Sequence, residues 1–88
     1  MEKMRRFNLI RKKINSIDRK VVNLLEKRMS LARKLGRIKK ESGEDIEDTA
    51  YEREHLDELA QKSSLRPIFL RGIFNEIFSE SKKTQRWS

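Results

Sequence analysis

The sequence of 88 residues contains no cysteine, so neither a disulfide framework nor a thiolate metal site can form. Its single histidine, His55, cannot make a zinc site alone, and we expect no metal. No apolar run approaches the ~20 residues of a membrane span, and no signal-peptide pattern follows the basic N-terminus. The sequence therefore predicts a cytoplasmic protein with no membrane partner.

Aromatic residues are also scarce, at 7%, whereas charged residues make up 41% and hydrophobic residues 35%. This composition is typical of long, solvent-exposed helices rather than of a sandwich or barrel. A chain this short buries little more than ~60% of its unfolded surface, so association with a second copy would add stability. We expect a single all-α domain over residues 1–88.

The net charge of +8 is unevenly distributed along the chain. Residues 1–42 hold fifteen Lys/Arg and four acids, a net of +11, whereas residues 43–88 hold seven and ten, a net of −3. A basic half of this kind indicates an anionic partner. Charge alone leaves nucleic acid, an acidic membrane and a small polyanion open.

Apolar residues recur along the first half of the chain in steps of three and four, as one face of a helix requires. We call this face the seam; its residues are Phe7, Ile10, Ile14, Ile17, Val21, Leu24, Leu31, Leu35 and Ile38. The seam predicts one long helix at about 5–41. At ~1.5 Å per residue this helix would be roughly 50 Å long, too long to bury itself in a compact monomer. We therefore expect it to pack against a partner chain.

Two shorter helices are predicted after the long one. A Ser-Gly break opens a loop at about 42–47. The next helix, at about 48–62, begins with Asp48 as an N-cap or first-turn residue. The last, at about 67–85, begins with Pro67, since proline is favoured at the first helical position.

Some cations of the long helix lie on or near the seam. Most point away and form a solvated basic face: Lys12, Arg19, Lys27, Arg33, Lys34 and Arg37. Arg28 occupies the seam step between Leu24 and Leu31, Lys39 lies within ~20° of the same line, and Arg11 lies at its edge. Burying a cation costs several kcal/mol unless an anion meets it. That anion is either another part of the protein or a ligand.

Polar residues also lie on the inward faces of the shorter helices. Asp48 and Glu52 share a face at i, i+4, although the helix dipole alone would favour acids there. Ser81 and Gln85 follow Ile77 at successive i+4 steps, although a frayed helix end would also explain them. Together with the cations of the seam, these residues describe a polar pocket in a helical bundle.

The cations of the long helix lie at different distances along it, so they cannot all contact the same ligand. Arg28 and Lys39 are eleven residues apart, ~16 Å, so both could contact one small ligand. Arg11 is ~25 Å from Arg28 and cannot reach that ligand from its own chain. If two long helices pack antiparallel, Arg11 of one chain approaches Arg28 of the other, and a two-fold dimer has two shared sites.

These motifs, in this order and spacing, resemble the all-helical AroQ-type chorismate mutase family. The matching residues are Ile10-Arg11-Lys12-Lys13-Ile14, Ile17-Asp18, Leu24-Leu25-Glu26-Lys27-Arg28, Ala32, Gly36-Arg37-Ile38-Lys39, Asp48, Glu52 and Ile77 to Gln85. The resemblance implies an isomerase of phenylalanine and tyrosine biosynthesis that converts chorismate to prephenate by a Claisen rearrangement. It also implies an intertwined helical homodimer, and neither a cofactor nor a covalent intermediate.

The resemblance implies roles for individual residues by matching position. The catalytic residues would be Arg28, Lys39, Glu52 and Gln85, and the substrate-binding residues would be these four with Arg11, Asp48 and Ser81. Arg28 and the partner's Arg11 would hold the two substrate carboxylates. Lys39 and Gln85 would donate hydrogen bonds to the ether oxygen.

On the other side of the substrate, Glu52, with the Asp48 region, would hold the ring hydroxyl, and Ser81 would support a carboxylate. Tyr51 departs from the family, because many members carry arginine just before the equivalent of Glu52. A phenol supplies no positive charge at neutral pH. We therefore predict either weaker substrate affinity or compensation by a neighbour such as Arg53.

Three alternatives remain. An isochorismate-pyruvate lyase would share the fold and the arginines, but Glu52 and Ser81 both match the mutase. A nucleic-acid-binding module would fit the basic half and Trp87, but aromatic residues do not interleave with the basic ones. A helical dimerisation element would explain the long helix and leave the polar inward residues unexplained. The sequence therefore favours the mutase, with no nucleic-acid partner.

Overall fold

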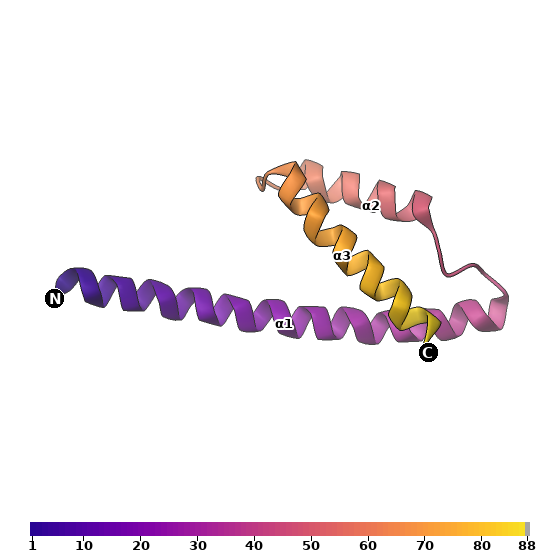
Figure 1. Ribbon diagram of the computed structural model, residues 1–88, viewed down its shortest axis with the longest axis horizontal. Helices are drawn as coiled ribbons and strands as arrows, with labels where there is room; N and C mark the ends of the chain where they lie inside the picture. Colours follow the sequence, from indigo (N-terminus) through magenta and orange to yellow (C-terminus); the bar gives the residue numbers. More distant parts are fainter. Residues whose placement is uncertain (88) are drawn as a thin grey trace. The chain divides into compact units, whose positions relative to one another are not determined.

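The computed structural model describes residues Met1–Trp87, and within them it contains three α-helices and no β-strand (Figure 1). In chain order these are α1 (Glu2–Ser42), α2 (Thr49–Lys62) and α3 (Pro67–Arg86). The predicted all-α class, with one long and two shorter helices, is confirmed. Over the same residues, no helix combines the length and the apolar character needed to cross a membrane.

The chain divides into two compact units within α1. Residues Met1–Ser30 form the first unit, which consists of the N-terminal turns of α1. The second unit begins at Leu31 and contains the last turns of α1 with α2 and α3. The contacts of α3 with α2 and with the last turns of α1 lie in this second unit.

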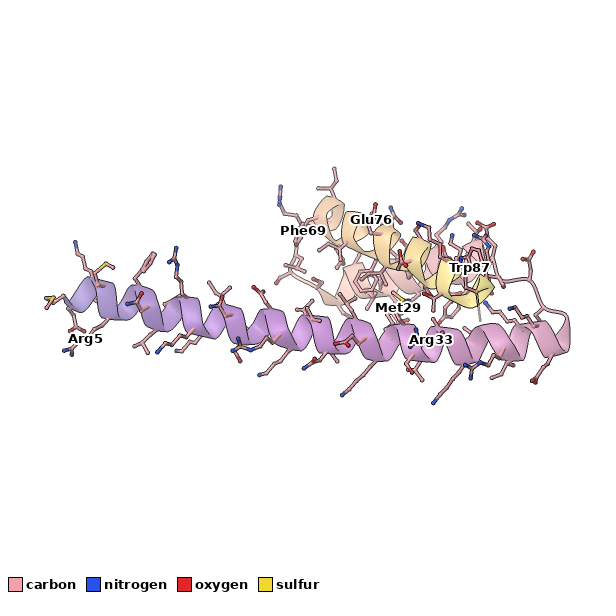
Figure 2. The ribbon with its side chains drawn as sticks, turned by 60° about the horizontal axis from the view of Figure 1, so that its bottom comes forward. Arg5, Met29, Arg33, Phe69, Glu76 and Trp87 are labelled. Carbon is pink, nitrogen blue, oxygen red and sulfur yellow. The ribbon has the colours of Figure 1, made fainter. Side chains whose placement is uncertain are left out.

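The first unit is a single helix whose seam is exposed. Leu24 is 63% exposed, Ile17 56% and Ile10 54%. Figure 2 shows the side chains projecting along this part of α1, with Arg5 near its beginning. Because one helix cannot cover its own apolar face, the hydrophobic effect favours packing of this seam against another surface.

The second unit has its hydrophobic core between α2 and α3, which form a helical hairpin (Figure 1). Leu56 of α2 and Leu70 and Phe78 of α3 are buried. The Phe78 ring packs against the rings of Phe74 and His55, with centroids 5.8 and 6.4 Å apart. His55 is therefore part of the packing between these helices.

The C-terminus of α1 is closed by a glycine. Gly43 has a φ of +73°, in the left-handed region that glycine adopts without strain. The Glu44 N–H donates to the Lys39 carbonyl oxygen at 2.9 Å, the long-range bond of a Schellman motif. This turn ends α1 at Ser42, about one helical turn after Lys39, and directs the chain toward α2.

The shorter helices begin as predicted from their N-terminal residues. Asp48 is the N-cap of α2, and its Oδ1 accepts a hydrogen bond from the Tyr51 N–H at 3.1 Å. Pro67 is the first residue of α3, where its missing N–H costs no helical hydrogen bond. Both helices therefore begin at residues that favour a helix N-terminus.

Candidate functional site

The last turns of α1 approach α3 closely at Gly36. A Cβ atom added to Gly36 would lie 2.6 Å from the Gln85 carbonyl oxygen and 2.8 Å from the Gln85 Cα. Side chains essentially never tolerate such distances, so this crossing requires glycine. The crossing places Gln85 next to the following turn of α1, which carries Lys39.

Lys39, Gln85 and Ser81 form a continuous polar chain at this crossing. The Lys39 Nζ donates to the Gln85 Oε1 at 3.0 Å and to the Ile46 carbonyl oxygen at 3.2 Å. The Gln85 Nε2 donates to the Ser81 Oγ at 3.3 Å. Gln85 and Ser81 are only 5% and 8% exposed, and Lys39 is half-buried. The frayed helix end considered for these two α3 residues is wrong, since both lie inside a helix that continues to Arg86.

Glu52 lies beside the same part of α3 and pairs with a lysine. The Lys82 Nζ is 3.4 Å from the Glu52 Oε1 and 3.5 Å from its Oε2. It also lies 3.5 Å from the Glu47 Oε1. Glu47 directly follows Ile46, whose carbonyl oxygen binds Lys39, so this short loop connects the two polar groups.

Asp48 occupies the same segment, between Glu47 and the first turn of α2. Its carboxylate accepts the Tyr51 N–H as the helix N-cap, and its side chain is exposed. The observed role of Asp48 is therefore to define where α2 begins, which in turn sets the position of Glu52. A role for Asp48 in substrate binding stays a prediction.

Arg11 and Arg28 belong to the first unit. The Arg11 guanidinium lies over the Phe7 ring, 4.4 Å from its centroid, in a cation–π contact along the helix. Arg28 follows on the same helix, eleven residues before Lys39. The roles predicted for both arginines in carboxylate binding stay predictions.

Two residues of this site, Lys82 and Gly36, are not among the site residues that the sequence predicts. Lys82 nevertheless lies within the predicted last helix and within α3. The signal for Lys82 was its i+4 spacing from Phe78, a core residue, which places its stem on an inward face. Gly36 belongs to one of the matching motifs. A small residue is needed there because α3 crosses α1 at this position, and the pattern within one helix does not predict a crossing between two helices.

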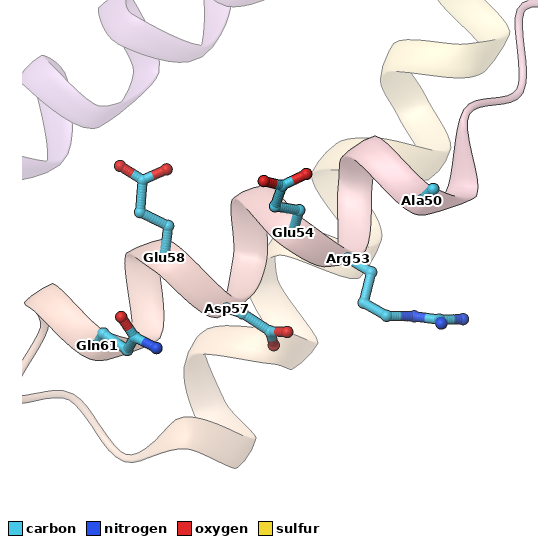
Figure 3. A pocket seen from close by; sticks show the side chains of 6 residues that line it. All are labelled: Ala50, Arg53, Glu54, Asp57, Glu58 and Gln61. Carbon is cyan, nitrogen blue, oxygen red and sulfur yellow. The ribbon is translucent and has the colours of Figure 1, made fainter.

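The compensating role predicted for Arg53 stays a prediction. Arg53 is exposed and lines a surface pocket whose residues all come from α2: Ala50, Arg53, Glu54, Asp57, Glu58 and Gln61 (Figure 3). None of the predicted site residues lines this pocket. Tyr51 is also exposed, and its ring stacks on His55 with centroids 5.9 Å apart. The cation that pairs with Glu52 is Lys82.

The arrangement suits a small molecule that carries negatively charged oxygens and a hydroxyl group. Lys39 and the Gln85 amide offer hydrogen-bond donors, while the Glu52 carboxylate offers acceptors. Fixed donors in a partly buried site stabilise negative charge more than water does. In the described part of the chain, no group of three or more His, Cys, Asp and Glu side chains is placed to hold a metal ion.

Comparison with known proteins identifies similar chains of established family. Residues 10–86 match the family model described as chorismate mutase type II. The chain is 33% identical over 81 residues to a bifunctional chorismate mutase/prephenate dehydratase of Buchnera aphidicola subsp. Acyrthosiphon pisum, a match that covers 89% of this chain and 21% of the relative. The corresponding enzyme of Buchnera aphidicola subsp. Schizaphis graminum is 33% identical over 79 residues, 86% of this chain and 20% of that protein.

The chain thus spans about a fifth of the length of the curated relatives it matches. A solved structure of a conserved hypothetical protein from Pyrococcus furiosus is similar over almost its whole length. That structure has a TM-score of 0.76 and 37% sequence identity, and the match covers 90% of this chain and 93% of that one.

Proposed function

Because the chain belongs to the chorismate mutase type II family, we propose that it converts chorismate to prephenate. The observation that carries this proposal is the partly buried polar chain of Lys39, Gln85 and Ser81, within the residues that match the family. The relatives whose names include chorismate mutase match over nearly the whole of this chain. The comparisons give no support to the lyase, the nucleic-acid-binding module or the dimerisation element.

The chemistry of this rearrangement suits the residues of the site. The reaction is unimolecular: a C–O bond of the substrate's ether breaks while a C–C bond forms, and no nucleophile or proton shuttle is required. The enzyme accelerates it by holding the compact conformer and by stabilising the transition state. Negative charge grows on the ether oxygen, so donors aimed at that oxygen lower the barrier.

We assign these donors to Lys39 and Gln85. An ammonium group has three N–H donors, and two of those on Lys39 bind the Gln85 Oε1 and the Ile46 carbonyl oxygen. The Gln85 amide has two N–H donors, one of which binds the Ser81 Oγ. Each side chain therefore keeps a donor for the ether oxygen while its remaining bonds fix its orientation.

The other substrate groups are assigned to the remaining predicted residues. Glu52, on the α2 turn that Asp48 caps, accepts a hydrogen bond from the ring hydroxyl group, and Ser81 supports one carboxylate. Arg28 holds a carboxylate as well, since guanidinium groups bind carboxylates through two parallel hydrogen bonds. The partner's Arg11 holds the other carboxylate, because Arg11 is too far along α1 to serve its own chain.

The homodimer in this proposal is supported by the exposed seam. Its residues remain about half-exposed along the whole of α1. Fully burying one Leu or Ile side chain gains about 1.5–3 kcal/mol, whereas association costs about 4–15 kcal/mol. A seam of this length is enough to offset that cost. An intertwined dimer in the cytoplasm, as expected from the sequence, completes the proposal.

The proposed activity is tested by mixing purified protein with chorismate and following the loss of chorismate absorbance. Acid converts prephenate to phenylpyruvate, which identifies the product. We expect prephenate to form, and to form far more slowly with the Arg28→Ala variant. Conversion of isochorismate to salicylate and pyruvate, without turnover of chorismate, would instead assign the lyase reaction.

A further inference from the structure

The Lys82 ammonium group lies between two carboxylates that come from the loop and from α2. It is 3.4 and 3.5 Å from the two oxygens of Glu52 and 3.5 Å from Glu47. The Lys82 and Glu52 side chains are each 21% exposed, whereas that of Glu47 is 55% exposed. Since water and salt screen a partly buried pair less, Lys82 acts mainly on Glu52.

The geometry of this pair leaves Glu52 able to accept a further hydrogen bond. Lys82 is nearly equidistant from both carboxylate oxygens, so it faces the carboxylate as a whole. A carboxylate can accept about four hydrogen bonds, and this contact uses only part of that capacity. The ion pair therefore restrains the three rotatable bonds of the Glu52 side chain without occupying all of its acceptors.

Lys82 also connects Glu52 to the rest of the site. It follows Ser81 directly on α3 and lies three residues, about one helical turn, before Gln85. Of the neighbours of Glu52 in sequence, Tyr51 stacks on His55 and supplies no charge. The same short segment of α3 thus carries the polar chain to Lys39 and the cation that pairs with Glu52.

We propose that Lys82 is a positioning residue, which holds the Glu52 carboxylate in the orientation that accepts the hydroxyl group of the substrate. This inference rests on the proposed mutase function. Lys82 acts through Glu52 and does not itself contact the reacting atoms. Removing its charge releases the Glu52 side chain and weakens a contact made both in the bound substrate and in the transition state, so KM rises more than kcat falls.

The test compares Lys82→Met, Lys82→Arg and Glu52→Gln with a matched control, Lys83→Met, which removes a neighbouring, exposed lysine from the same helix. We expect Lys82→Met to lower kcat/KM about tenfold, mainly through KM. Lys82→Arg should keep most of the activity, because it keeps the charge. Lys83→Met should match the wild type, and far-UV circular dichroism with thermal unfolding checks that each variant folds. If Lys82→Met does not fold, Lys82→Gln replaces it.

A double variant separates positioning of Glu52 from an independent role. Lys82→Met should cost little further activity in the Glu52→Gln background, because there is no carboxylate left to position. A further tenfold loss in that background, or equal activity of Lys82→Met and Lys83→Met, would overturn the Lys82 proposal alone. A wild-type protein that does not turn over chorismate would overturn the proposed function and this inference together.

Discussion

Lys39 connects α3 to the loop between α1 and α2. It donates to Gln85 on α3 and to the Ile46 carbonyl oxygen in the loop that leads to Glu47. Replacing it with an apolar side chain would leave a buried amide oxygen without this donor, and it would remove the charge proposed to face the ether oxygen. Both the stability of the protein and its catalytic rate should therefore fall.

We predict that Lys39→Met lowers kcat about 10²–10³-fold, the loss seen when one donor to a developing oxyanion is removed. The loss of stability should be about 1–3 kcal/mol. Lys34→Met is the matched control, since Lys34 is exposed on the same helix. Steady-state kinetics and urea unfolding measure both effects. Equal kcat values for the two variants would show that Lys39 takes no part in the chemical step.

At this scale, helical phase identified two polar side chains of α3 that face inward, but it also selected Asp48, whose side chain is exposed. Ser81 and Gln85 were selected because they continue the stripe of Ile77, and both are buried. Helical phase did not identify Lys82 as a site residue. The long stem of a lysine can lie on an inward face while its charge extends to a partner on another helix. Only the placement of α2 beside α3 reveals that this partner is Glu52.

At the scale of helices, the crossing of α1 and α3 at Gly36 positions the site. A methyl group on Gly36 would contact the backbone of Gln85, which cannot rotate away as a flexible side chain would. Any larger residue must therefore separate the two helices. The Lys39–Gln85 hydrogen bond lies at this crossing, so its geometry depends on the glycine.

Two glycine-to-alanine variants test this dependence. Gly36→Ala should lower the free energy of unfolding by about 1–3 kcal/mol, the usual cost of overpacking, and should lower activity with it. Gly72→Ala is the control, since a Cβ there meets nothing within 4 Å and Gly72 lies inside α3. It should stabilise the protein by about 0.5–1 kcal/mol through helix propensity. Denaturant unfolding measures both, and equal effects would contradict the close crossing.

The sequence predicted the helices well because their signals are local. The seam, the Asp48 cap and Pro67 each act within a few residues, and each corresponds to a feature of the observed helices. The crossing at Gly36 is a contact between residues 49 positions apart in the chain, Gly36 and Gln85. Hydrophobic periodicity gives the face of each helix but not the distance between two helices, so this contact was not predictable.

At the scale of the whole molecule, the proposal requires two chains that bury their seams. We predict that Leu24→Glu converts the dimer to a monomer and abolishes activity, because a charge inside an apolar interface costs several kcal/mol. Asn23→Glu introduces the same charge one residue away, off the seam, and should remain dimeric and active. Light scattering coupled to size-exclusion chromatography measures the mass. A Leu24→Glu variant that stays dimeric would place the interface elsewhere.

In the proposed dimer, each chorismate-rearranging site is built from Arg28 of one chain and the partner's Arg11. The most direct test mixes Arg11→Ala and Arg28→Ala variants, unfolds and refolds them together, and measures prephenate formation. Each variant alone should be nearly inactive, whereas half of the refolded dimers should combine one chain of each variant. Each of these dimers regains one intact site of two, so the mixture should reach about a quarter of the wild-type activity. A mixture no more active than its separate components would contradict the shared site.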